Sequence, residues 1–174
     1  MSQNQGIFDV GLAQKPANFQ ALTPLSFLGW AEEVYGARTA VIHGDIQFTY
    51  SQFAARCRLL ASALTGRGIG QGDTVSLMSP NTPPMLEAHY GVPMIGAVLN
   101  SLNYRLDAPT IAFILDHGES KVIITDREFS PVIKEALAIL GRDIIVIDVD
   151  DPLAKGGELI GEKDYEAFLE EGDP

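Results

Sequence analysis

The order of apolar and polar positions after residue 20 predicts a helix at the start of the ordered chain. Thr23 supplies an N-cap hydroxyl, and Pro24 occupies the first helical position, where a missing N–H costs nothing. Apolar residues then recur on one face of the helix, and Gly36 ends it. We therefore expect the first helix to run from residue 24 to residue 35.

Two short apolar runs follow this helix and predict a β-hairpin. Residues 40–43 and 46–49 read as strands around Gly44-Asp45, and glycine accepts the positive φ that a two-residue loop requires. Thr49 and Gln52 have the spacing of a capping box, so a second helix is expected to begin directly after the hairpin.

The next stretch alternates strands and helices over short loops. The expected elements are strand 74–78, helix 83–94, strand 97–99, helix 108–117, strand 121–125, helix 130–140 and strand 144–149. We expect the strand at 97–99 to be buried. This alternation favours an α/β fold, a three-layer arrangement in which a mostly parallel sheet is covered by helices, with a small N-terminal hairpin.

The chain divides into three expected segments. Residues 1–20 carry little periodicity and are expected to form an irregular segment, with Phe8 and Phe19 as anchors. Residues 21–150 form the α/β unit. Residues 151–174 are strongly acidic and are interpreted as a solvated connector.

Composition narrows the class of protein. A length of 174 residues with 46% hydrophobic content supports one core, and a net charge of −11 argues against nucleic acid as a partner. The single cysteine, Cys57, excludes an internal disulfide and a cysteine metal cluster, and its place on an apolar helix stripe predicts burial. No apolar run is long enough to span a bilayer, and the first five residues lack the features of a secretory signal, so we expect a cytoplasmic protein.

Several familiar site patterns fail on spacing. The glycines between Gly66 and Gly72 follow a helix and precede a strand, the reverse of a dinucleotide-binding loop, and no P-loop sequence occurs. His43, His89 and His117 are dispersed. The acidic cluster Asp148, Asp150 and Asp151 lacks the rest of a calcium loop and is interpreted as a solvated turn. We therefore predict no catalytic residue and no metal site in this chain.

One block of sequence is more specific. Ser79-Pro80-Asn81-Thr82-Pro83-Pro84-Met85-Leu86-Glu87, continued from Tyr90 to Asn103, resembles the N-terminal subdomain of adenylate-forming acyl-CoA synthetases. More narrowly, it is similar to the branch with butyrate-type and methylmercaptopropionate-CoA ligases, which activates short- and medium-chain or aryl carboxylic acids. Other matching segments are Leu22–Leu28, Phe48–Tyr50, the turn Gly68–Asp73, and Arg105–Leu115, so that the resemblance covers residues 22–147.

The resemblance implies a ligase that forms an acyl-adenylate from ATP and a carboxylic acid and then transfers the acyl group to CoA. ATP, Mg and CoA are thus implied for the full-length enzyme of fatty acid metabolism. The family's phosphate-binding segment ending in Pro-Lys-Gly is not found in these 174 residues, so no cofactor is expected here and the chain alone is expected to be inactive. Residues 151–174 then resemble the connector toward the AMP-binding core.

The resemblance also implies partners and contact residues. The expected partners are the rest of the same polypeptide, a second copy in a homodimer, and the carboxylic acid and CoA in the full-length enzyme. The residues expected at the edge of the substrate pocket are Asn100, Asn103 and Arg105, with backbone hydrogen bonding in a tight turn as the favoured alternative for the two asparagines. The residues expected to contact the missing core or a dimer partner are Met85, Leu86, Met94 and Ile95.

Two origins fit these expectations: an expressed piece of a longer enzyme, which we favour, or a natural truncation with a binding or assembly role. Three functions therefore remain open. The first is a subdomain of an acyl-CoA synthetase. The others are a stand-alone flavodoxin-like module that binds a small molecule and an oligomerisation module without a ligand.

Overall fold

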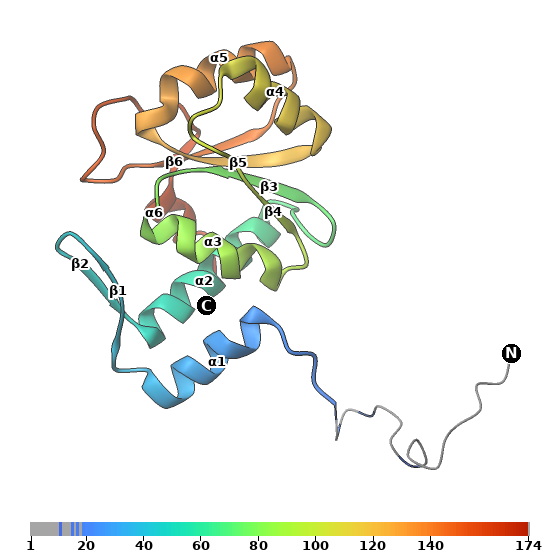
Figure 1. The fold of residues 1–174 in the computed structure, drawn as a ribbon, viewed down its shortest axis with the longest axis vertical. Helices are drawn as coiled ribbons and strands as arrows, with labels where there is room; N and C mark the ends of the chain where they lie inside the picture. Colours follow the sequence, from blue (N-terminus) through green and yellow to red (C-terminus); the bar gives the residue numbers. More distant parts are fainter. Residues whose placement is uncertain (1–10, 12–14, 16, 18, 174) are drawn as a thin grey trace, which may run out of the picture.

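The computed structural model describes residues 11, 15, 17 and 19–173, in which helices cover both faces of a parallel sheet and a hairpin projects to one side (Figure 1). Phe8 lies outside the described residues, and the side chain of Phe19 is half exposed. The elements are α1 (Pro24–Tyr35), β1 (Thr39–His43), β2 (Ile46–Thr49), α2 (Tyr50–Gly66), β3 (Thr74–Met78), α3 (Pro83–Met94), β4 (Val98–Ser101), α4 (Ala108–His117), β5 (Ser120–Asp126), a 3-10 turn (Arg127–Phe129), α5 (Ser130–Leu140), β6 (Ile145–Val149), β7 (Lys163–Asp164) and α6 (Tyr165–Leu169).

The sheet has the strand order β4-β3-β5-β6-β7, and every neighbouring pair is parallel. Its first strand, β3, therefore lies between the second and third strands, the 2-1-3-4-5 order of flavodoxin-like domains. The predicted α/β fold is confirmed. The strand expected at 97–99 is present as Val98–Ser101, but the expectation that it is buried is wrong, because it is an edge strand and the Val98 side chain stays 53% exposed.

The two faces of the sheet carry separate cores because successive side chains of a strand point to opposite sides. On β5, Val122 and Ile124 join the cluster formed with α2, α3 and α6, whereas Ile123 joins the cluster formed with α4 and α5. Figure 1 shows these two helical layers on either side of the sheet. All three side chains are fully buried, which explains why the strand reads as a continuous apolar run.

The sequence predicts some of the N-terminal capping contacts of the helices correctly, but not all. Thr49 and Gln52 form the expected capping box, and the Asp107 carboxylate accepts a hydrogen bond from the Thr110 N–H at 3.1 Å. The expected cap by Thr23 is wrong: its hydroxyl makes no cap bond to the backbone and lies instead 3.3 Å from the Ser26 hydroxyl. The Thr23 hydroxyl thus contacts the hydroxyl of Ser26 in place of the backbone N–H that it would bind in a capped helix.

The acidic segment after residue 150 is not solvated throughout, contrary to the sequence-based interpretation. It forms β7 at the edge of the sheet and the short helix α6, which packs against α2 and β6. Tyr165, Phe168 and Leu169 are buried in the core cluster below the sheet. Their spacing of three and four residues places them on one face of the helix, while the intervening Glu166 is exposed.

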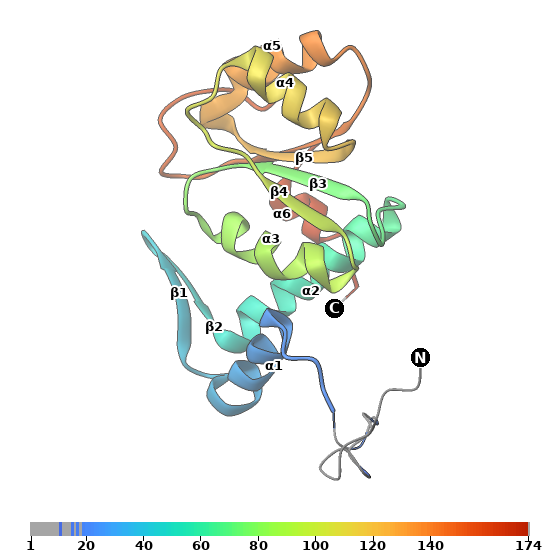
Figure 2. The ribbon, with the colours of Figure 1, turned by 45° about the vertical axis from the view of Figure 1, so that its right-hand side comes forward.

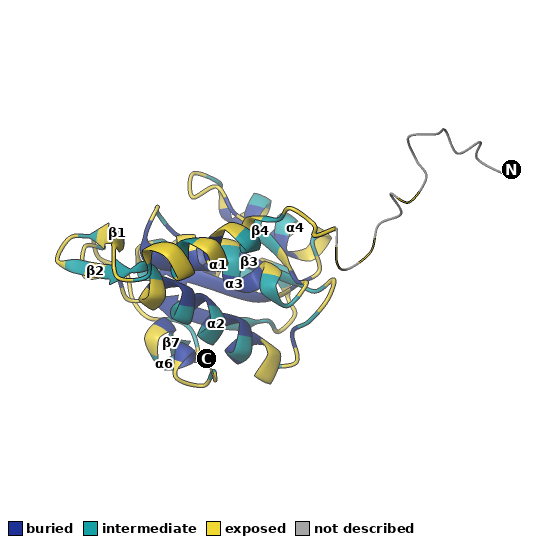
Figure 3. Cartoon of the chain, turned by 90° about the horizontal axis from the view of Figure 1, so that it is seen from below, coloured by how far each residue is buried: buried dark blue, intermediate teal, exposed yellow. Residues whose placement is uncertain are grey.

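The hairpin and α1 pack onto α2 rather than onto the sheet (Figure 2). They share a small cluster with Leu28, Phe53, Ala54 and Cys57, all of which are buried. Burial of Cys57 confirms its predicted packing role. In Figure 3 the hairpin is drawn as intermediate and exposed, whereas β3 and the inner faces of α2 and α3 are buried. This arrangement leaves hollows between the hairpin and the main body of the domain.

Candidate functional site

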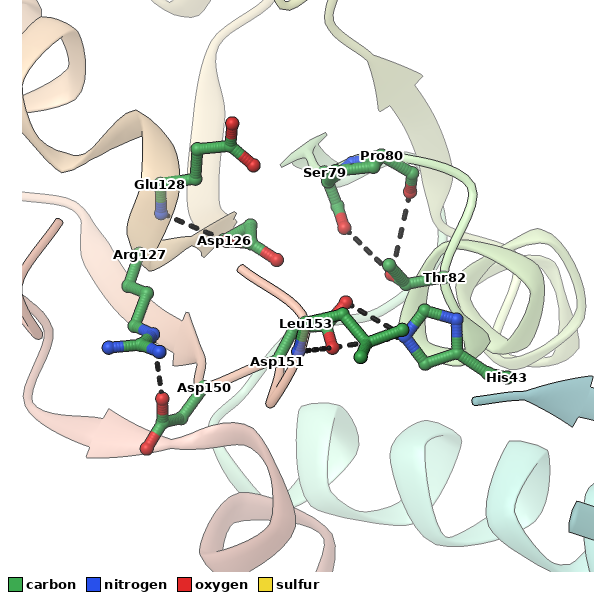
Figure 4. A network of polar contacts seen from close by, with 10 residues as sticks. All are labelled: His43, Ser79, Pro80, Thr82, Asp126, Arg127, Glu128, Asp150, Asp151 and Leu153. Carbon is green, nitrogen blue, oxygen red and sulfur yellow. Dashed lines mark hydrogen bonds and ion pairs between the residues drawn. The ribbon is translucent and has the colours of Figure 1, made fainter. Parts of the chain in front are cut away.

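Polar loops meet at the carboxyl edge of the sheet, where β3, β5 and β6 end (Figure 4). After β3, the hydroxyl oxygens of Ser79 and Thr82 lie 2.8 Å apart. After β5, Asp126 accepts a hydrogen bond from the Glu128 N–H at 2.9 Å. The strand order reverses between β3 and β5, and ligands of open α/β sheets bind outside the carboxyl ends of the strands at such a point. This edge is therefore the candidate functional site.

A hydrogen-bonded pair of side chains connects the hairpin to the loop after β6. His43 Nε2 lies 3.0 Å and 2.9 Å from the two carboxylate oxygens of Asp151, which also accepts the Leu153 N–H at 2.8 Å. Asp151 is only 7% exposed. Because 108 positions separate His43 from Asp151, no local spacing in the sequence could reveal this contact.

The predicted solvated turn at the end of β6 is therefore wrong for two of its three acids. Asp148 is buried and accepts the Gly161 N–H at 2.6 Å, and Asp151 is held by His43. Only Asp150 is exposed, and it pairs with Arg127 at 2.9 Å. The segment after β6 supplies the Gly161 and Leu153 N–H donors of the two carboxylates, and the hairpin supplies His43.

Asp126 and Asp148 each leave one buried carboxylate oxygen at this edge without a hydrogen-bond partner among the described residues. The Asp126 side chain is fully buried, and its unpartnered atom is Oδ2. Burial raises the pKa of Asp126, and the Asp151 carboxylate raises it further, while the hydrogen bond from the Glu128 N–H opposes both. A buried and unpaired acceptor of this kind is rare in folded proteins and is often found at functional edges.

A second polar cluster lies between α2, α3 and α6. Arg56 Nε and Nη2 donate to the two carboxylate oxygens of Glu87 at 2.6 and 3.3 Å, and Nη1 and Nη2 donate to Glu166 at 2.7 and 2.6 Å. The Tyr165 hydroxyl donates to Glu87 at 2.8 Å. We call Arg56, Glu87, Tyr165 and Glu166 the Arg56 network.

Charge and burial act against each other in the Arg56 network. Burial acts to lower the pKa of Arg56, but its hydrogen bonds to Glu166 and Glu87 outweigh this and hold the pKa above its usual range. Burial also raises the pKa of Glu87, while Arg56 and Tyr165 oppose that rise. The sequence analysis missed this network, because 31 positions separate Arg56 from Glu87 and 110 separate it from Glu166.

Two hollows border the hairpin. The first, which we call the α1–α3 cleft, has a volume of about 660 Å³ and lies between α1, β1 and the first turns of α3. The second, which we call the hairpin–α6 cavity, has a volume of about 330 Å³ and lies between the hairpin, the loop after β6 and the start of α6. His43 and Thr82 line both, so the two hollows adjoin at the carboxyl edge.

The three residues predicted at a pocket edge lie apart from these hollows. Asn100 donates to the Ser76 hydroxyl at 3.1 Å on the sheet itself. The Asn103 side chain accepts the Arg105 N–H at 3.0 Å, which is the turn contact that the favoured alternative describes for asparagine. The Arg105 guanidinium stacks at 5.7 Å from the ring of Tyr104. Their role at a substrate pocket stays a prediction.

The four residues predicted at an interface fall into two pairs at opposite ends of α3. Met85 and Leu86 line the α1–α3 cleft, and Leu86 is 40% exposed. Met94 and Ile95 line a separate shallow hollow beside the C-terminal half of α2. One flat contact surface therefore does not include all four, and their interface role stays a prediction.

Among the described residues, neither an activated cysteine nor a cluster of metal ligands is found. Burial raises the pKa of the Cys57 thiol, with a further rise caused by Glu87, so the reactive thiolate is disfavoured. Within residues 19–173 and the isolated positions before them, no three His, Cys, Asp or Glu side chains gather as metal ligands. Among the helices of that same part, none combines the length and apolar character that crossing a bilayer requires.

Comparisons with known proteins place this fold in one family. The model of the AMP-binding enzyme family matches residues 28–173. The chain is 45% identical to the peroxisomal acetate/butyrate–CoA ligase of Arabidopsis thaliana, covering 94% of this chain and 31% of that protein. It is 44% identical to the acetate–CoA ligase of Humulus lupulus, with the same two coverages. A benzoate CoA ligase from Burkholderia xenovorans superimposes with a TM-score of 0.74 at 22% identity over 86% of this chain and 28% of that one, which shows the fold.

These matches confirm the resemblance that the block after β3 indicates. The chain spans about a third of the length of the curated relatives it matches, 31% for the first two. The family match covers the hairpin, the whole parallel sheet and the acidic segment with α6. The chain belongs to the AMP-binding enzyme family.

Proposed function

We propose that this chain is the N-terminal subdomain of an acyl-CoA synthetase that activates a short- or medium-chain carboxylic acid. The observation that carries this proposal is the 45% identity to an acetate/butyrate–CoA ligase over 94% of the chain. In the complete enzyme, ATP and Mg would support formation of an acyl-adenylate, and CoA would accept the acyl group. Residues 151–174 would lead toward the AMP-binding core, and fatty acid metabolism is the proposed setting.

We further propose that the subdomain contributes a scaffold and contact surfaces, and that the chain alone does not activate acids. Two features of the carboxyl edge support this. Asp126, Glu128 and Asp151 give it negative charge, which repels a triphosphate. Helix α3 begins with Pro83 and Pro84, which lack the N–H groups that bind phosphate at other helix starts. Stabilisation of a transferred phosphoryl group needs free cations and donors, whereas Arg127 at this edge is paired with Asp150, and His43 is bound to Asp151.

A chimera tests the proposal directly. The matching third of the Arabidopsis acetate/butyrate–CoA ligase is replaced by this chain, and formation of butyryl-CoA from butyrate, ATP and CoA is measured. We expect the chimera to be active, because the fold and nearly half of the residues agree. A second chimera, with a flavodoxin-like domain from outside the family at the same position, serves as the control and is expected to be inactive. Folded but inactive chimeras of both kinds would contradict the proposal.

The isolated chain tests the alternative functions. The 2-1-3-4-5 strand order also supports a stand-alone binding module, because small flavodoxin-like domains bind ligands at the same edge. We expect calorimetric titration with MgATP and with CoA to show no binding; saturable binding of either would favour the stand-alone module. The proposed dimer contacts at Met85 and Leu86 predict self-association in light scattering, and a monomer at high concentration would remove that part of the proposal.

The location of the protein also stays a proposal. The sequence favours the cytoplasm, but the Arabidopsis relative is named as peroxisomal. Fluorescence microscopy of the tagged chain in its own cells tests this, and concentration of the signal in an organelle would contradict the cytoplasmic assignment.

A further inference from the structure

The hairpin–α6 cavity has the size of a site for a small molecule. Its volume of about 330 Å³ falls at the lower end of the range of ligand pockets. The walls are formed by apolar side chains from three separate segments, which contribute Ile46 and Phe48, Pro83, and Val149 and Pro152. The block of sequence that carries the family resemblance supplies only Pro83 and its neighbours, so most of this cavity is unrelated to that block.

The charged groups around the cavity are unequal in sign. Four acidic residues line it, Asp150, Asp151, Asp164 and Glu166, against two basic ones, Arg56 and His43. Arg56 already donates four hydrogen bonds within the Arg56 network, so it has little capacity for an anionic ligand. His43 Nε2 is held by Asp151 in the same way.

Two of the carboxylates retain free acceptor capacity. Asp164 uses Oδ1 to accept the Ala167 N–H at 2.9 Å, and Asp150 uses Oδ1 to pair with Arg127 at 2.9 Å. Among the described residues, the Oδ2 atoms of both have no hydrogen-bond or ion-pair partner within the usual distances. Carboxylate oxygens at the rim of an apolar cavity are complementary to an ammonium group carried on an apolar body.

We propose that the hairpin–α6 cavity binds a small apolar amine, whose hydrocarbon body lies against Phe48, Val149 and Pro152 and whose ammonium group lies between Asp150 and Asp164. This site is separate from the proposed acid activation, because its negative rim disfavours the carboxylate that the enzyme would activate. Its occupant would contact both the hairpin and α6, which lie more than a hundred positions apart in the chain. Binding would therefore hold the hairpin against the end of the domain.

The test uses three probes of the same shape and different charge. Benzylammonium, benzyl alcohol and benzoate are titrated into the 15N-labelled chain at about 0.15 M salt, where the Debye length is about 8 Å and distant charges are screened. We expect saturable amide shifts for benzylammonium in residues 43–48, 149–152 and 164–166, weaker shifts for the alcohol, and none for benzoate. Equal binding of amine and alcohol, or stronger binding of benzoate, would overturn the proposal.

Charge variants separate a site from general attraction to an acidic protein with a net charge of −11. Asp150→Asn with Asp164→Asn keeps the shape of the rim and the cap of α6, and should weaken benzylammonium binding about tenfold, the equivalent of one charge-assisted hydrogen bond. Two further variants, Asp116→Asn with Glu158→Gln, remove the same charge at exposed positions outside the cavity lining and should leave the affinity unchanged. An equal loss in both double variants would show nonspecific attraction and refute the site.

Discussion

Two buried carboxylates of this domain differ sharply in their surroundings. Glu87 in α3 and Asp126 at the end of β5 are both fully buried. Glu87 receives two donors from Arg56 and one from the Tyr165 hydroxyl, whereas Asp126 receives one backbone N–H and leaves Oδ2 unpaired within the described residues. The difference shows that burial alone does not set the cost of a charge. The number and sign of its partners do.

The positions of the two acids explain why they differ. Glu87 lies between helices that pack face to face, where it joins the C-terminal helix α6 to α2 through Tyr165 and Arg56. Asp126 lies at the carboxyl edge of the sheet, where ligands of this fold class bind. We infer that the first acid serves the stability of the domain, and that the second is tolerated at an edge where function outweighs stability.

The largest change in stability should follow loss of the Arg56 guanidinium from the Arg56 network. Arg56→Met keeps the aliphatic stem but leaves Glu87 buried without its counterion, which should lower the free energy of unfolding by about 3–5 kcal/mol. Urea denaturation followed by circular dichroism measures it. Arg58→Met is the matched control in the same helix, because Arg58 pairs with the partly exposed Glu32 and its loss should cost less than about 1 kcal/mol. Similar losses in the two variants would show that the Arg56 network is not special.

A smaller loss of stability should follow removal of the Tyr165 hydroxyl from the Arg56 network. Tyr165→Phe keeps the buried ring but deletes the hydrogen bond to Glu87, and we expect a loss of about 2 kcal/mol, as for a hydrogen bond to a charged group. Hydrogen exchange of α6 should become faster in the same variant. Tyr35→Phe, at a ring that is 46% exposed, is the control and should change stability little. Unchanged stability in Tyr165→Phe would mean that Arg56 alone satisfies Glu87.

At Asp126 we expect a substitution to stabilise the domain, the opposite of the effect expected for Arg56 and Tyr165. Its pKa is raised above the value in the unfolded chain, so the stability that it contributes is present below the unfolded pKa and is lost as the pH rises through the folded pKa. Asp126→Asn does not ionise and keeps an acceptor for the Glu128 N–H. It should therefore stabilise the domain by about 1–2 kcal/mol at pH 7, and the difference should vanish below about pH 4.

Denaturation midpoints between about pH 3 and pH 8, which bracket the unfolded pKa of aspartate, check this prediction. Asp143→Asn, at an exposed position before β6, removes the same charge and should have no such pH-dependent effect. A destabilised Asp126→Asn at neutral pH would show that the ionised carboxylate has a favourable partner in solution.

Local sequence signals predict most elements of this fold and little of its polar site. The capping box at Thr49, the loop at Gly44 and the apolar runs of the strands depend on neighbours within a few positions, so periodicity and turn chemistry reveal them. The edge position of Val98 depends on strand order, which an apolar run does not encode. Composition suggested a solvated acidic tail, yet Tyr165 and Phe168 bury its helix.

The polar contacts are harder to predict from the sequence because their partners are distant in the chain. Arg56 lies on the side of α2 that the apolar stripe leaves out, so spacing alone predicts a solvated side chain rather than one that is mostly buried. Asp126 follows an apolar strand and resembles any acid at a strand end. Only the packing of α3 and α6 on α2, and of the loop after β6 beside β5, decides which charge is paired.

The smallest predicted effect links the hairpin to Asp126. His43→Leu removes the side-chain donor of Asp151, which keeps the Leu153 N–H, and the less compensated Asp151 charge should then repel the Asp126 carboxylate more strongly. In Asp126→Asn this repulsion is absent, so His43→Leu should cost about 0.5 kcal/mol less there than in the unchanged protein, as a double-mutant cycle at pH 7 measures. His43→Leu with Asp143→Asn is the control cycle and should be additive. Additivity between positions 43 and 126 would show that the carboxylates of Asp151 and Asp126 do not repel each other measurably. The contrast between Glu87 and Asp126 would then depend on hydrogen bonds alone.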